Sequence, residues 1–161
     1  VPPKKGRKHV MRLITEILSF RPKGTETDLA VPLEYLSRIM SRHSVAFLLS
    51  DFQAPPDDFL HALRVVGRRH DLVPVVVRDA MEEELENLGL TLVQDLETGD
   101  PVWLDTASAR VRASYAEAMK VRHQQLLQLF RKHKMDAIDV ETGGGYVQAL
   151  VQFFKLRARR Y

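Results

Sequence analysis

The chain has 161 residues, 45% of them hydrophobic, and a formal net charge of +3 at pH 7. This length suits one domain with a core of its own, so we treat residues 1–161 as a single domain. The absence of cysteine excludes disulfides and thiolate metal sites. No apolar run approaches the roughly 20 residues that span a bilayer. These features favour a cytoplasmic protein.

Charge is unevenly distributed along the chain. The first 24 residues carry seven Lys or Arg and one Glu, whereas residues 79–100 carry eight Asp or Glu and no Lys or Arg. A polarised surface can orient a protein partner, although an acidic stretch can also be simply solvated. A nucleic-acid-binding surface would carry mainly positive charge, so we expect no nucleic-acid binding.

Hydrophobic periodicity and turn signals predict the elements in chain order. In the first half we expect a helix over 9–20, a helix from about 28 to 41, a buried strand over 44–49, a helix from about 57 to 69 and a strand over 72–77. Pro32 could delay the start of the second helix to Val31. In the second half we expect an acidic helix over 82–88, a hairpin with strands 90–96 and 102–105 around the turn 97–100, a helix over 107–134, a strand over 135–140 and a helix over 146–157. Thr27 can cap the second helix, and Asp105 or Thr106 the long one.

The apolar run 44–49, which leads into Ser50 and Asp51, organises this pattern. It is typical of a strand buried on both faces, and amphipathic helices lie on either side of it. We therefore predict an α/β fold with a parallel, helix-covered sheet. Ligands bind at the carboxyl ends of such strands, which makes Asp51 the first candidate for chemistry. A carboxylate that only caps the turn is the alternative.

The first candidate site is a magnesium site. Thr27 at a helix entrance and Asp51 at a strand end could supply oxygen ligands to Mg²⁺, or could be two independent caps. The glycines at 143–145 sit at a strand-to-helix turn but lack the P-loop ending, so we expect a flexible turn. The histidines show no metal-ligand spacing, and we expect surface or capping roles for them.

An enzymatic alternative uses the acidic residues. A metal-dependent hydrolase or nuclease would need Asp51, Asp79 and Asp28 to converge on one cleft. The strand ends at Asp51 and Asp79 allow this. No general base accompanies them in the sequence, so we favour a non-enzymatic protein.

Several ordered segments resemble one family. They are 5–10 (Lys-Gly-Arg-Lys-His-Val), Thr27-Asp28-Leu29, 48–52 (Leu-Leu-Ser-Asp-Phe), 68–72 (Arg-Arg-His-Asp-Leu), Glu97-Thr98-Gly99, Asp105-Thr106, Arg110-Val111-Arg112, Tyr115 and 149–154 (Ala-Leu-Val-Gln-Phe-Phe). Together they resemble the domain-of-unknown-function family fifty-eight, which comprises bacterial von Willebrand factor A-like proteins associated with MoxR-type ATPases.

This resemblance implies a Rossmann-like von Willebrand A sheet with a metal-ion-dependent adhesion site. Thr27, with Thr25 as a fallback, matches its threonine, and Asp51 matches its second aspartate. The D-x-S-x-S element does not occur in this chain. The family would place it upstream of Val1 with the first three strands. We therefore expect a partial domain without its amino-terminal strands, Mg²⁺ in the complete parent domain and no cofactor in this fragment.

The resemblance also implies a function. Family members are expected to be adaptors that act with a MoxR-type AAA ATPase on a client protein, in protein maturation or complex assembly. The resemblance does not decide whether the parent protein is tethered to a membrane. Strand 44–49 would lack its neighbour, so we expect a homodimer through this edge; the alternative is a monomer whose helix 9–20 covers it.

Overall fold

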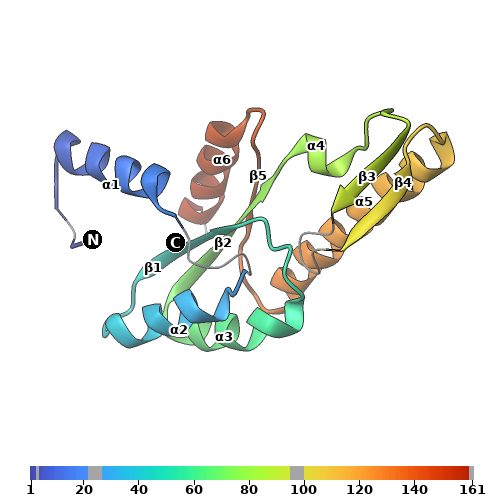
Figure 1. The fold of residues 1–161 in the computed structure, drawn as a ribbon. Helices are drawn as coiled ribbons and strands as arrows, with labels where there is room; N and C mark the ends of the chain where they lie inside the picture. The colour runs from blue at the N-terminus through green and yellow to red at the C-terminus, as the bar shows by residue number, and fades with distance from the viewer. Residues whose placement is uncertain (3, 22–26, 95–99, 160–161) are drawn as a thin grey trace.

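The computed structural model describes residues 1–2, 4–21, 27–94 and 100–159, and Figure 1 shows their arrangement. At the centre is a three-stranded sheet in the order β1-β2-β5. Its strands are β1 (Val45–Ser50), β2 (Asp71–Arg78) and β5 (Ile138–Glu141). Both neighbouring pairs are parallel, which confirms the predicted α/β class. The observed fold is consistent with a Rossmann-like, von Willebrand A-type sheet.

Helices cover the two faces of this sheet unequally. Helices α2 (Ala30–Ile39) and α3 (Pro56–Arg69) lie on one face, and α6 (Tyr146–Ala158) lies on the other (Figure 1). The larger core cluster includes Leu33, Phe59, Leu63, Val66 and Phe130, whereas Phe153 of α6 packs with Val73, Val75 and Ile138. The sheet is therefore sandwiched at β2 and β5.

Strand β1 is not buried on both faces as predicted. Its side chains alternate, and Val45, Phe47 and Leu49 are 55%, 43% and 66% exposed. Ala46 and Leu48 pack against the core of α2 and α3. The reason is that α6 packs mainly on β2 and β5 and reaches β1 through Phe154, whose ring lies 6.2 Å from that of Phe47 between centroids. In addition, β1 is an edge strand that pairs only with β2 within the described residues. The apolar run thus leaves one row of its side chains about half exposed to water.

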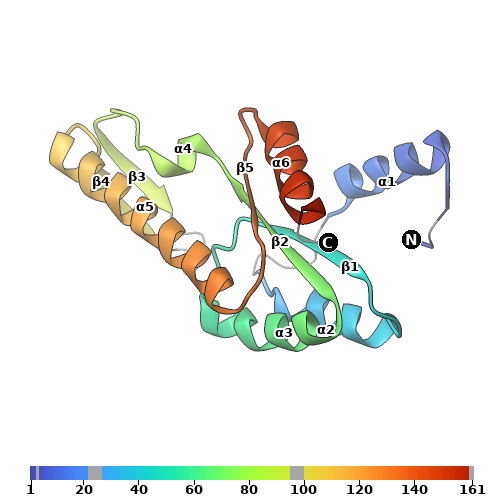
Figure 2. The ribbon, with the colours of Figure 1, turned by 180° about the vertical axis from the view of Figure 1, so that it is seen from behind.

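A hairpin extends away from the central sheet. Strands β3 (Leu90–Gln94) and β4 (Pro101–Asp105) pair antiparallel beside the long helix α5 (Ala109–Lys132), as both views show (Figures 1 and 2). This confirms the predicted hairpin; apart from Asp100, its predicted turn at 97–100 lies outside the described residues. Helix α5 begins later than expected. Ser108 caps it, because Thr106 is instead buried and bonds Gly89.

The remaining helices differ in how much they pack. Helix α4 (Ala80–Glu83) begins earlier than the predicted 82–88 because Asp79 caps it by accepting from the Met81 N–H. Helix α1 (Arg7–Ser19) has no buried residue and projects beyond the β1 side of the sheet in both views (Figures 1 and 2). No helix within the described ranges is both long and apolar enough to cross a membrane.

Candidate functional site at the carboxyl ends of the parallel strands

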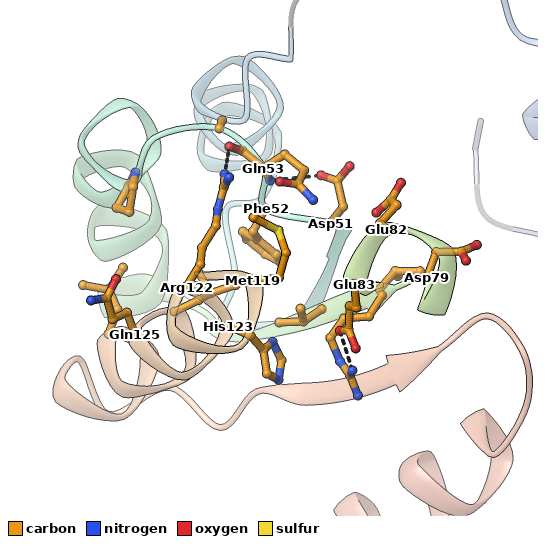
Figure 3. A pocket seen from close by; sticks show the side chains of 17 residues that line it. Asp51, Phe52, Gln53, Asp79, Glu82, Glu83, Met119, Arg122, His123 and Gln125 are labelled. Atoms are coloured by element: carbon orange, nitrogen blue, oxygen red, sulfur yellow. Dashed lines mark hydrogen bonds and ion pairs between the residues drawn. The ribbon is translucent and has the colours of Figure 1, made fainter. Parts of the chain in front are cut away.

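A cleft of about 300 Å³ lies where β1 and β2 end and α5 passes over them (Figure 3). Its lining is mixed. Apolar contributions come from Phe52, Val76, Val77, Met119, Leu126 and Leu129. Charged or polar contributions come from Asp51, Arg78, Asp79, Glu82, Glu83, Arg122 and His123. This is the edge at which open α/β sheets bind their ligands. The cleft is therefore the candidate functional site.

The turn after β1 sets the orientation of Asp51. Phe52 is buried although its φ is +54°, a left-handed conformation that costs energy for a residue with a side chain. Its N–H donates to Ser50 Oγ (3.0 Å), and its ring packs on Phe59 and Phe130 with centroids 5.6 and 5.1 Å apart. These contacts hold the turn and leave the Asp51 carboxylate exposed at the rim.

Four polar side chains form a continuous hydrogen-bonded chain beside the cleft. His123 Nε2 lies 3.0 Å from Asp139 Oδ2, Arg78 Nε donates to Asp139 Oδ1 (2.7 Å) and Arg78 Nη1 donates to Glu83 Oε1 (2.6 Å). Burial of Arg78 acts to lower its pKa, but the hydrogen bonds and charges of Asp139 and Glu83 outweigh it and raise the pKa above its ordinary value. Arg78 is thus a fixed cation that ties β2 to β5 and α4.

Helix α5 is fastened to the cleft at two further points. Arg122 donates from its guanidinium to the carbonyl of Gln53, as Figure 3 shows. The Tyr115 hydroxyl donates to the carbonyl of Glu82 (2.8 Å). The opposite sides of the cleft are therefore joined by side chains of one helix, which favours a pre-formed site.

The structure separates the residues that the sequence singled out. Asp51 lines the cleft, whereas Thr27 is exposed and is not among the lining residues; Thr25 lies outside the described residues. Thr27 is not the helix cap either. Asp28 takes that role, because its carboxylate accepts from the N–H groups of Ala30 (2.8 Å) and Val31 (3.3 Å). The proposed pairing of Thr27 with Asp51 remains a prediction.

Asp79 lines the same cleft as Asp51, but both of its oxygens are engaged. One accepts from the Met81 N–H (2.9 Å) and the other from the Thr142 hydroxyl (3.0 Å). The position of Asp79 is therefore explained by capping α4 and fixing the turn after β5.

The donor set offers little for a metal ion. Within the part of the chain that the structure describes, no group of three or more His, Asp or Glu side chains is placed to hold one. Asp51 Oδ1 accepts from the Gln53 N–H (3.2 Å), and Thr27 contributes one hydroxyl at most. Two oxygens fall short of the roughly six that Mg²⁺ takes.

We predict that this chain binds Mg²⁺ weakly or not at all. Two protein ligands would leave most of the coordination shell to water, so isothermal calorimetry should give a dissociation constant above about 1 mM. A micromolar constant that is lost in Asp51→Asn, but kept in the matched variant Asp57→Asn on α3, would contradict this prediction and favour a metal-dependent enzyme.

Comparisons with known proteins assign the family. The family model described as "Protein of unknown function DUF58" matches residues 1–125. The chain belongs to the DUF58 family. It is 27% identical over 161 residues to uncharacterized proteins of Mycobacterium bovis and Mycobacterium tuberculosis, covering 99% of this chain and 50% of each of theirs. An uncharacterized protein of Mycobacterium avium matches at the same identity over 94% of its length.

The DUF58 chain thus spans about half the length of the first two relatives. No solved structure matches it significantly.

Sequence reasoning did not single out most of the DUF58 cleft. Arg78, Arg122, His123 and Met119 all line it, and Asp139 joins two of them, but only Asp51 and Asp79 were candidates. A usable signal was present at Arg78, a charged residue at the end of the buried apolar strand β2. No local signal marks His123, because its partner Asp139 lies 16 residues away on another element.

Proposed function

We propose that this chain is a non-enzymatic protein-interaction module that works with a MoxR-type AAA ATPase and its client in protein maturation or complex assembly. The ATPase and client follow from the family resemblance. The proposal places the module in the cytoplasm, where ATP is available, whether or not the parent protein is tethered to a membrane.

An uncovered apolar surface is the observation that supports this proposal most. A depression of about 520 Å³ opens over the sheet where Phe47 and Leu49 of β1 meet Leu150 and Phe154 of α6. Val45 and Tyr146 are also exposed on these elements. Large apolar patches are rare on monomeric proteins unless another protein covers them. Helix α1 adds further exposed apolar side chains, namely Val10, Met11, Ile14, Ile17 and Leu18.

An acidic surface on and after α4 supports an electrostatic contact with the ATPase. Glu82, Glu84 and Glu86 are exposed there. The sequence showed no Lys or Arg within residues 79–100 that could neutralise these acids. One of them, Glu83, is nevertheless paired with Arg78. Asp95 and Glu97 lie outside the described residues. The exposed glutamates are therefore the ones to test.

We expect the triple variant Glu82→Lys, Glu84→Lys and Glu86→Lys to slow association with the cognate ATPase. Loss of electrostatic steering should lower the association rate about tenfold at low salt, and the difference should shrink as salt is raised. Stopped-flow or biolayer interferometry measures this rate. Glu34→Lys with Glu117→Lys, on α2 and α5, is the control. An unchanged rate, or an equal loss in the control, would remove the acidic surface from the proposal.

A metal-dependent hydrolase or nuclease is the second candidate. Its support is that Asp51 and Asp79 line one cleft with Arg78 and His123. Asp28, the third carboxylate of this alternative, is not among the lining residues and caps α2 instead. The calorimetric titration with Mg²⁺ described above separates this candidate from the adaptor, because only the enzyme requires a tightly bound metal.

A further inference from the structure

A second cavity lies at the opposite end of the sheet from the cleft. Its volume is about 640 Å³, and we call it the basal cavity. The last turns of α3, the start of β2, the segment that follows α5 and Arg157 of α6 form its walls. Its size is within the range of small-molecule sites, roughly 300–1,000 Å³.

A buried histidine of the basal cavity lacks partners. His70 lines the cavity and is only 4% exposed. Neither of its ring nitrogens has a hydrogen-bond partner within the described part of the chain. A neutral imidazole carries one donor and one acceptor, and buried polar groups are nearly always paired. The unpaired His70 ring therefore points to a polar group, beyond the described residues, that occupies this place.

The cavity also has an excess of positive charge. Of its cations, Arg157 is neutralised, because it donates to both oxygens of Asp71 (2.7 and 2.5 Å) and lies 3.6 Å from Asp136. These two are the acidic side chains of the lining. The side chains of the other cations have no hydrogen bond or ion pair within the described ranges; they are Arg64, Arg68, Lys132 and Lys134. Four charges around one cavity are thus free to meet an anion.

Helix dipoles explain only part of this arrangement. Arg68 and Lys132 lie in the last turns of α3 and α5, where cations complement the helix dipole. That effect falls off within one turn, and Arg64 lies more than a turn before the end of α3. The dipole also gives no partner to the buried ring of His70. A ligand accounts for both observations.

We propose that the basal cavity binds a small phosphorylated molecule through its phosphate groups. Guanidinium groups match phosphate oxygens in a two-pronged geometry, which suits Arg64 and Arg68. Lys132 and Lys134 add charge from the end of α5 and the segment after it, and the ligand supplies the hydrogen-bond partner that the His70 ring lacks. Inorganic phosphate alone would leave most of 640 Å³ empty, so the ligand is a phosphate ester or a diphosphate. This site does not depend on the proposed function.

Titration of the full chain with inorganic pyrophosphate, followed by calorimetry or NMR, tests the site. We expect saturable binding with a dissociation constant below about 1 mM at roughly 0.1 M salt. Lys132→Gln combined with Arg64→Gln should weaken binding at least about tenfold, because hydrogen bonds to charged groups are lost. Lys120→Gln, the same change elsewhere on α5, should have no effect.

A second variant separates a binding role from a structural one. His70→Phe keeps a buried aromatic ring and removes the unpaired nitrogens, so the melting temperature should hold or rise while pyrophosphate affinity falls. Three results would overturn the proposal. The first is a calorimetric or NMR response that chloride reproduces at equal ionic strength, and the second is unchanged pyrophosphate affinity in a folded His70→Phe variant. The third is preferential, steeply salt-dependent binding of a short oligonucleotide, which would make the surface a nucleic-acid site.

Discussion

Replacing Phe130 with alanine is expected to lower the free energy of unfolding by about 3–5 kcal/mol, the usual range for a buried phenylalanine. Phe130 is 1% exposed and joins α5 to the main core. Its ring also packs on Phe52, whose left-handed backbone shapes the cleft. The substitution therefore removes a large core contact and the support of a strained turn. Urea denaturation followed by circular dichroism measures the change.

Phe154→Ala is the matched control for this prediction. Phe154 is 51% exposed, so its truncation should cost no more than about 1 kcal/mol, because half of the ring is in water already. Similar losses for the two variants would show that α5 does not anchor the core as the structure has it.

We also expect the chain to self-associate through β1, and Phe47→Lys to weaken that association. The outer edge of β1 has no pairing strand among the described residues, and such edges recruit other strands. Antiparallel pairing of two copies centred on Phe47 would set Val45 opposite the second Leu49, and His43 opposite the second Asp51. Directly opposed residues share a face, so the exposed row of each strand would be buried together.

Lysine at position 47 would place two like charges at the centre of this pairing. We expect the dimer dissociation constant to rise at least about 100-fold, or roughly 3 kcal/mol. Sedimentation velocity at micromolar concentration measures it. Trp103→Lys, another exposed aromatic but on the hairpin, should leave the dimer intact. A wild-type monomer at about 100 μM, or a dimer that Phe47→Lys does not affect, would contradict the edge as the driver.

Much of the fold could be predicted because its elements carry strong local patterns. Apolar runs mark β1 and β2, and a helical spacing of apolar residues marks α5. The exposed row of β1 could not be predicted in the same way. It depends on where α6 packs on the sheet, and Phe153 of α6 packs with Val73 and Val75 of β2 and Ile138 of β5. The helix caps also differ from those predicted. Asp28, not Thr27, caps α2. Ser108, not Asp105 or Thr106, caps α5.

The candidate site was predictable only where the chain itself brings residues to a strand end. Asp51 and Asp79 follow β1 and β2, so the rule for parallel sheets places both at one edge. The pairing of Arg78 with Asp139 spans 61 residues, and no local signal announces it. His70 belongs to the same class, because an Arg-Arg-His segment gives no sign in sequence that its histidine is buried while the arginines are exposed.

The most direct test of the central claim is an equilibrium titration of the wild-type chain against a purified MoxR-type ATPase, the proposed partner, read by biolayer interferometry or calorimetry. The account predicts saturable binding, with a dissociation constant in the micromolar range or below, that needs no added Mg²⁺ at the Asp51 cleft. No binding up to about 100 μM ATPase, together with Mg²⁺-dependent hydrolysis that Asp51→Asn abolishes, would contradict it and establish the enzyme instead.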